Sequence, residues 1–330
     1  MAYAPYKLGK IQIGREATPG TAVAATKILA GASAMPSDER TRKIFEPQVG
    51  VLSPEEIIYD TFVLAKLAMP QRPLNFQQLP YTLDAGIKTV SPTGVGPYGW
   101  TYPLNAGATP NAIKTYTIEA GNVAVPTDNY KMEYSVVEEF ALSAKAGEEW
   151  MISDNWFGRQ LTQATMTPAL AIPTGLEVAT LARTKLFIDA VGGTVGTTQK
   201  NGVLMETSMK VKTGLVYIPV GDGNLFFAAI KNVKPEVTFT MAWEVEDGSL
   251  VAAERAFYRS NTRRLFKWQI EGAVPANAKA EITWAGRYDK FGDYQNSNGN
   301  TTIVVEGHAD YDSAAALLWQ AIVTNQVASL

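Results

Sequence analysis

The side chains that could do chemistry are few and scattered along this 330-residue sequence. It has one histidine, His308, and no cysteine. A metal site or a catalytic triad built on imidazole needs partner residues. His308 lies in a strand-like run with Glu306 and Asp310, so we interpret it as a solvated side chain on a polar strand face. The lack of cysteine excludes disulfides, thiolate nucleophiles and cysteine-ligated zinc.

Carboxylate pairs are the next candidates, because two carboxyl groups can hydrolyse a glycosidic bond. Adjacent residues of a strand point to opposite faces, so sequence neighbours cannot converge on one substrate. A solvated strand face explains the one pair with a spacing of two. We therefore expect no catalytic residue among Glu138-Glu139, Glu148-Glu149 and Glu244 with Glu246.

Glycine-rich and oxygen-rich runs resemble ligand loops only superficially. The runs at 94–97, 192–196 and 221–223 neither open a helix nor carry the Lys-Ser/Thr of a nucleotide loop. The run at 293–300 lacks the first and last ligands of a calcium loop. We read them as turns and a hairpin loop, and expect no cofactor and no metal ion.

Composition limits the possible functions further. The 29 basic and 32 acidic residues nearly balance, so the chain lacks the charge of a protein that grips nucleic acid. With 46% apolar residues it can bury a large core and is long enough for two domains. No charged leader or apolar run of membrane-spanning length is evident, so we expect it to be made and used without crossing a membrane.

Alternation with a period of two is the dominant pattern and predicts a mainly β protein. It is clearest at 234–246, where Val237, Phe239, Met241, Trp243 and Val245 share one face and Thr238, Thr240, Glu244 and Glu246 the other. Tryptophans on such apolar faces predict core packing rather than a carbohydrate platform. Further strands are predicted at 6–13, 61–69, 115–120, 130–144, 185–191, 203–218, 264–270, 280–288 and 301–312.

Two helices interrupt the strands, one in each half. The first is predicted at 76–87 with Asn75 as N-cap, although Pro80 favours a start further inward. The second is predicted at 249–258 with Leu250, Ala253 and Phe257 on one face. Because the order strand, helix, strands occurs twice, we predict an internal duplication with domains at 1–170 and 171–330.

Two segments rich in proline or glycine, 31–59 and 91–112, are predicted to be long loops without regular structure. We expect the first to be an arm that reaches another subunit. The predicted assembly interface comprises Arg40, Arg42, Lys43, Ile44 and Phe45 on this arm, with Arg263 and Arg264 at a subunit contact.

The stretch GREATPGTAVAAT at 14–26 resembles the N-terminal signature of tail tube proteins, the major tail proteins of long-tailed bacteriophages. The segments at 72–83, 183–202 with 213–214, and 321–325 are similar to further parts of that family, in the same order. Each segment is a general pattern of small and apolar residues. Their combination covers most of the chain.

The resemblance implies two tandem tail-tube β-sandwich domains, each flanked by one helix. Copies would form trimeric rings with pseudo-sixfold symmetry, or hexameric rings, that stack into a hollow tube for DNA ejection. The implied partners are a tape-measure protein, a tail terminator and tail-tip proteins, and the location is the virion tail after synthesis in the host cytoplasm. We expect the 14–26 stretch to thread between neighbours, and the lumen, lined by Thr238, Thr240, Glu244 and Glu246, to be net negative.

Three alternatives stay open at this point. The chain could be another tail component, such as a terminator or the inner tube of a contractile system. It could be an extracellular carbohydrate-binding module or adhesin with an exposed aromatic strip. A hydrolase on a sandwich would depend on Glu148 or Glu244.

Overall fold

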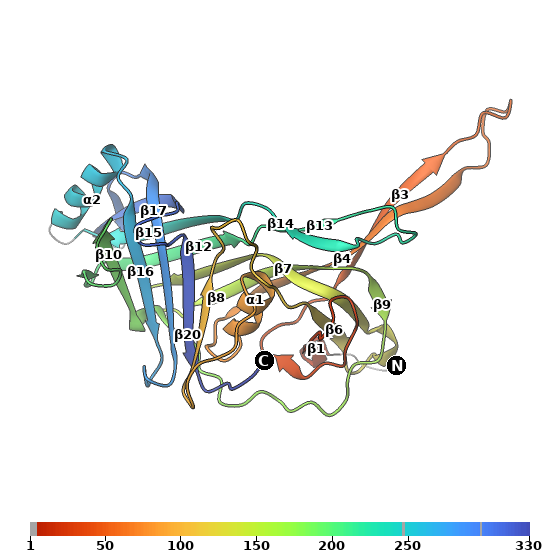
Figure 1. Ribbon diagram of the computed structural model, residues 1–330, viewed down its shortest axis with the longest axis horizontal. Coiled ribbons are helices and arrows are strands. Elements are labelled where there is room, and N and C mark those ends of the chain that lie inside the picture. Colours follow the sequence, from red (N-terminus) through yellow and green to blue (C-terminus); the bar gives the residue numbers. More distant parts are fainter. Residues whose placement is uncertain (1–4, 246–247, 298) are drawn as a thin grey trace.

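The computed structural model describes residues 5–245, 248–297 and 299–330, and it is mainly β, as predicted (Figure 1). The strands are β1 (Gly9–Arg15), β2 (Lys27–Leu29), β3 (Ser37–Phe45), β4 (Ile57–Pro73), β5 (Tyr98–Pro103), β6 (Tyr116–Asn122), β7 (Tyr130–Lys145), β8 (Met151–Gly158), β9 (Leu161–Gln163), β10 (Thr184–Ala190), β11 (Gln199–Lys200), β12 (Leu204–Lys212), β13 (Leu215–Ile218), β14 (Ala229–Asn232), β15 (Glu236–Glu244), β16 (Arg264–Glu271), β17 (Lys279–Phe291), β18 (Gln295–Ser297), β19 (Asn300–Ala309) and β20 (Trp319–Asn325). The helices are α1 (Leu79–Gly86) and α2 (Ser249–Arg259). Neither described helix has the length and apolar character needed to cross a bilayer.

The strands pair in two sets that follow the same scheme. In the first set, β1 pairs with β6, β6 with β7, β7 with β8, β8 with β4, and β4 with β3. In the second set, β10 pairs with β16, β16 with β17, β17 with β19, β19 with β15, and β15 with β12. The members come in the same chain order, and α1 follows β4 as α2 follows β15. All of these pairings are antiparallel.

Smaller details of the two sets also correspond. The short β2 adds to β1 as β11 adds to β10, and β9 adds to β7 as β20 adds to β17. The register of β7 against β8 shifts after Val137, and that of β17 against β19 shifts after Tyr288. The repeated strand order predicted from the sequence is therefore present in the pairing scheme.

The two sets join edge to edge inside the chain. The second half of β7 pairs with β12, with Phe140 opposite Val211 and Glu139 opposite Lys212. This junction makes one continuous sheet across both sets. The division into domains 1–170 and 171–330 stays a prediction, because the sheet continues across that boundary.

The core lies beneath the alternating strands. Along β15, Val237, Phe239, Met241 and Trp243 are buried, so the predicted apolar face is confirmed. All seven tryptophans are buried, which confirms core packing for Trp243 and the indoles of the later strands. Four of these rings, at positions 156, 243, 268 and 284, leave the indole N–H without a hydrogen-bond partner, so apolar packing alone holds them.

The helices differ from the prediction in detail. α1 begins at Leu79, three residues later than the predicted start, because Pro80 occupies the first turn. The side chain of Asn75 still accepts a hydrogen bond from the backbone N–H of Gln78 at 2.9 Å. In α2 the predicted face is confirmed in part: Leu250 packs against the core and Phe257 is half-buried, but Ala253 is exposed and the fully buried residues are Val251 and Glu254.

Both predicted loops contain a strand, so that prediction was wrong. β3 lies within 31–59 and pairs with β4 although every residue of β3 is exposed. Both faces of β3 are solvated, so its sequence shows no apolar alternation. β5 lies within 91–112 and pairs with β20, with Trp100 and Tyr102 buried on one face.

The GREATPGTAVAAT stretch packs against its own chain. The Glu16 carboxylate is buried and accepts hydrogen bonds from the hydroxyls of Thr115 and Thr117 and from the backbone N–H groups of Gly20 and Tyr134. These four donors satisfy both oxygens of a buried charge. Glu16 thus closes the turn after β1, and most of the residues that follow it are exposed, so the threading of this stretch between neighbouring subunits stays a prediction.

Candidate assembly surfaces

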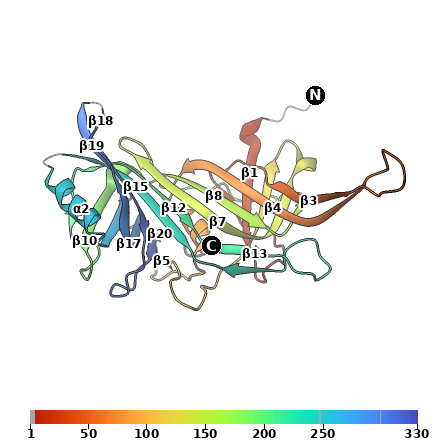
Figure 2. The same ribbon diagram turned by 90° about the horizontal axis from the view of Figure 1, so that it is seen from above.

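A two-stranded arm projects from one end of the molecule. It is formed by β3 and the first half of β4, and Figures 1 and 2 both show it extending beyond the rest of the sheet. Ile44 and Phe45 are 59% and 53% exposed, as the predicted role in assembly requires. The exposed apolar residues of the arm continue through Val49, Val51, Leu52, Ile57, Ile58 and Tyr59. An exposed apolar cluster of this kind is typical of an interaction surface.

The charged part of the arm is internally paired. Arg40 contacts Asp38 at 2.9 Å and Asp60 at 3.1 Å, and Arg42 contacts Asp60 at 2.9 Å. These hydrogen bonds, from Arg42 first and then Arg40, lower the pKa of Asp60. Lys43 is exposed nearby. Solvent-exposed pairs of this kind contribute little to stability and can exchange partners at low cost.

The second strand set has a hairpin at the position of the arm, but it folds back. β13 and β14 pair with each other between β12 and β15. The fold-back begins at Gly214, which has a φ of +79° and lies so close to the Val233 carbonyl that a Cβ would be 2.4 Å from its oxygen. Phe227 from this hairpin is buried against Phe157 and Tyr134. The β13–β14 hairpin is therefore seated within the chain. Its Tyr217 ring stacks on Phe62 at the base of the β3–β4 arm, and the outer part of that arm is exposed.

The predicted contact residues Arg263 and Arg264 lie at the opposite end, where β16 begins. Arg263 donates to Asp310 at 2.7 Å and is partly exposed. Arg264 is 6% exposed and forms a bidentate pair with Glu254 of α2, at 2.8 and 3.0 Å. The guanidinium of Arg264 is thus used inside the chain, and a role of Arg263 and Arg264 at a subunit contact stays a prediction.

A buried carboxylate on each helix binds the first residue of the next strand in its set. Asp84 of α1 accepts a hydrogen bond from the Tyr116 hydroxyl at 2.7 Å, and Glu254 of α2 binds Arg264. Burial, the largest influence, raises the pKa of Asp84 despite the hydrogen bond from Tyr116 and the charge of Arg15. We did not identify these anchors from the sequence. The signal for the second was Arg264 itself, a charged residue on the apolar face of its predicted strand.

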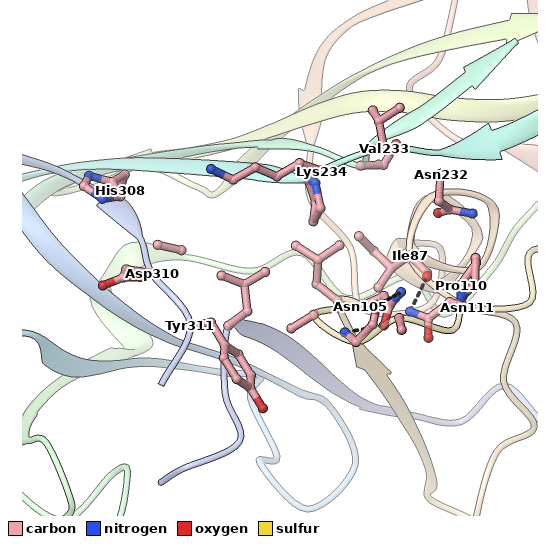
Figure 3. Close-up of a pocket in the computed structure, with 18 residues that line it drawn as sticks. Ile87, Asn105, Pro110, Asn111, Asn232, Val233, Lys234, His308, Asp310 and Tyr311 are labelled. Carbon is pink, nitrogen blue, oxygen red and sulfur yellow. Dashed lines mark hydrogen bonds between the residues drawn. The ribbon is translucent and has the colours of Figure 1, made fainter. Parts of the chain in front are cut away.

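A cleft of about 530 Å³ lies between the two strand sets (Figure 3). Two of its titratable residues, His308 and Asp310, are engaged with other side chains. His308 Nδ1 is 2.7 Å from Asp289 Oδ1. Burial opposes ionisation of Asp310, but hydrogen bonds from Arg287 and Arg263 outweigh it and lower its pKa. The described residues contain no cluster of three or more His, Asp or Glu side chains suited to a metal ion.

Three of the four predicted lumen residues lie on the solvated face of β15. Thr238 is exposed, and Thr240 and Glu244 are half-buried. Glu246 lies outside the described residues. Lysines accompany the acidic groups of this sheet, in the pairs Lys210–Glu139, Lys212–Glu236 and Lys290–Glu306. A net negative lumen stays a prediction.

Comparison with known proteins gives no assignment: no protein-family model matches the chain, and no curated protein matches it.

Proposed function

We propose that this chain is a structural subunit of a bacteriophage tail tube, a protein that assembles with copies of itself into stacked rings around a channel for DNA. The shape of the molecule and the adhesion of its edges would then be its function. The proposal requires no catalytic residue, cofactor or metal ion.

The observation that carries the proposal is the edge-to-edge junction of β7 with β12. It joins two strand sets with the same pairing scheme into one sheet, side by side rather than face to face. β3, the counterpart of β12, pairs with β4 alone among the described strands. An exposed strand edge is a template for pairing with another chain. Repeating the same junction between copies would continue the sheet, and a head-to-tail contact that closes gives a ring.

The two-set chain favours trimeric rings with pseudo-sixfold symmetry over hexameric rings. The β3–β4 arm, with its apolar residues, would contact the next ring of the stack. The solvated face of β15 would line the lumen, where threonine hydroxyls and carboxylates leave the phosphates of passing DNA hydrated and unbound. Tape-measure, terminator and tail-tip proteins are the expected partners in the virion tail.

Negative-stain microscopy of the purified protein tests the proposal. We expect concentration-dependent rings or tubes with a central hole. A chain that stays monomeric at all concentrations would contradict it. A single capping ring that never stacks would favour a tail terminator, and binding of a monomer to a glycan array would favour a carbohydrate-binding module.

A further inference from the structure

We infer that the residues Ser37–Arg40 of one copy pair with Asp289–Gly292 of the next copy as antiparallel strands, with Glu39 opposite Lys290 and Arg40 opposite Asp289. The inference rests on the proposed function, because it presupposes that copies of the chain associate. It identifies the two edges and the register of their contact.

The register follows from matching rows across the two strand sets. In the first set, a row of residues directly opposite one another on neighbouring strands runs from Ser37 through Lys66 and Phe157 to Val136. In the second set, the matching row runs from Lys210 through Thr238 and His308 to Arg287. Ser37 therefore corresponds to Lys210, and Val136 corresponds to Arg287.

Within the chain, β12 contacts β7 in a known register. Lys212 lies opposite Glu139, and the backbone N–H of Thr213 donates to the carbonyl of Glu138 at 3.0 Å. The register shift after Val137 in the first set and after Tyr288 in the second aligns the two rows. The register of β12 on β7 then predicts the register of β3 on the β17 of another copy. Glu39 and Lys290 take the places of Lys212 and Glu139, and Arg40 and Asp289 take those of Thr213 and Glu138.

Among the described strands no further one pairs with either edge of this contact, and the two edges lie at opposite ends of the molecule (Figures 1 and 2). Arg255 of α2 donates to the Gly292 carbonyl at 3.3 Å. On β17, pairing with β16 ends at Gly286, and the backbone N–H of Gly292 donates to Val304 of β19. Because alternate residues of a strand point their backbone groups to opposite sides, Asp289 and Phe291 face the open side. On β3, Pro36 precedes the proposed segment and ends the ladder, since it has no N–H to donate.

Charge gives an independent check of the register. The register from the matching rows places Glu39 opposite Lys290, an attractive pair. A slip by one residue in one direction places Arg40 opposite Lys290, and like charges directly opposite are destabilising. A slip in the other direction places Glu39 opposite Asp289 and Asp38 opposite Lys290, so one repulsion accompanies one attraction. The present partners of these side chains are the exposed pairs Lys66–Glu39, Arg40–Asp38, Arg40–Asp60, Lys290–Glu306 and His308–Asp289, which exchange at low cost.

The helices support the same contact. At the internal junction α1 is buried along its whole length, and a Cβ on Gly86 would lie 3.1 Å from the Thr213 side chain, next to the end of β12. At the open end, α2 buries only Val251 and Glu254. A neighbouring β3 placed on β17 would bring Arg40, the counterpart of Thr213, beside α2.

Cysteine cross-linking tests the register, because the natural chain has no cysteine. We expect E39C/K290C to form covalent multimers on oxidation under assembling conditions. The two residues form a non-hydrogen-bonded pair, the antiparallel position with the shorter Cα separation. The matched control R40C/K290C is offset by one residue on β3, whose register is regular there, so its thiols point to opposite faces and we expect little cross-linking.

A charge swap tests the pairing without a covalent bond. We expect E39K and K290E each to raise the concentration needed for assembly about tenfold, and the double variant E39K/K290E to restore it. Circular dichroism of each monomer checks that these exposed substitutions leave the fold intact. Rings that form with no E39C/K290C cross-link and no rescue would overturn the inference but leave the proposed function standing. A chain that neither assembles nor cross-links would overturn both.

Discussion

The buried pair between Glu254 and Arg264 gives the most demanding test of the packing described above. The pair fastens α2 to the start of β16, and both side chains are almost fully buried. Glu254 accepts two hydrogen bonds from Arg264 and a third from the Tyr288 hydroxyl at 3.0 Å. Water cannot replace these bonds in so buried a site.

Glu254→Ala leaves the Arg264 guanidinium charged, buried and without its partner. Breaking a buried ion pair on one side costs about 3–5 kcal/mol, so we expect the free energy of unfolding to fall by that amount. Urea unfolding followed by tryptophan fluorescence measures the change, at a concentration where the chain is monomeric. Trp243, whose ring centroid is 6.1 Å from that of Tyr288, is a local reporter.

Two companion variants make the result specific. The double variant Glu254→Leu with Arg264→Met replaces both charges by apolar groups, and we expect it to recover most of the loss. Asp60→Ala breaks an exposed pair on the arm and should change stability by less than about 1 kcal/mol. A Glu254→Ala change as small as that of Asp60→Ala would refute the buried-pair account.

Three further predictions concern other parts of the chain. Gly214→Ala should lower the free energy of unfolding by about 1–3 kcal/mol, because the new Cβ would clash with the Val233 carbonyl. Gly221→Ala is the control in urea unfolding, because a Cβ at that position contacts no other atom. Because the pKa of Asp84 is raised, the folded state binds the proton of this carboxyl more tightly than the unfolded state does. The contribution of Asp84 to stability therefore falls as pH rises above about 3.9. Asp84→Asn should remove this fall from a plot of melting temperature against pH. Phe45→Ser should change the free energy of unfolding by less than about 0.5 kcal/mol. It should also reduce the number of tubes seen by microscopy.

Half-buried strands were predictable because their physics is local. Thr238 and Phe239 point to water and to the core respectively, and a sequence records that contrast with a period of two. The helix positions were predictable for the same reason, within a few residues. β5 was not predicted, because the glycines and prolines around Trp100 indicated a loop and its apolar alternation is short.

The rest depended on contacts that a single segment does not record. β3 has no apolar face, so only its pairing with β4 reveals it as a strand. The pairing of Glu254 with Arg264 determines which face of α2 is most buried. Apolar periodicity alone does not predict that a glutamate lies on this face. The open edge at Asp289 and Lys290 became visible only when both strand sets could be matched row by row.

The two junctions carry opposite charges, and this difference fixes the order of the strand sets in an assembly. At the internal junction Lys212 faces Glu139, whereas between copies Glu39 faces Lys290. If β3 of one copy bound β7 of another, Glu39 would face Glu139; if β12 bound a foreign β17, Lys212 would face Lys290. Like charges directly opposite destabilise a pair of strands, so each wrong combination is disfavoured. In the proposed ring, first and second sets would then alternate, which would make the covalent chain, rather than the single set, the repeating unit.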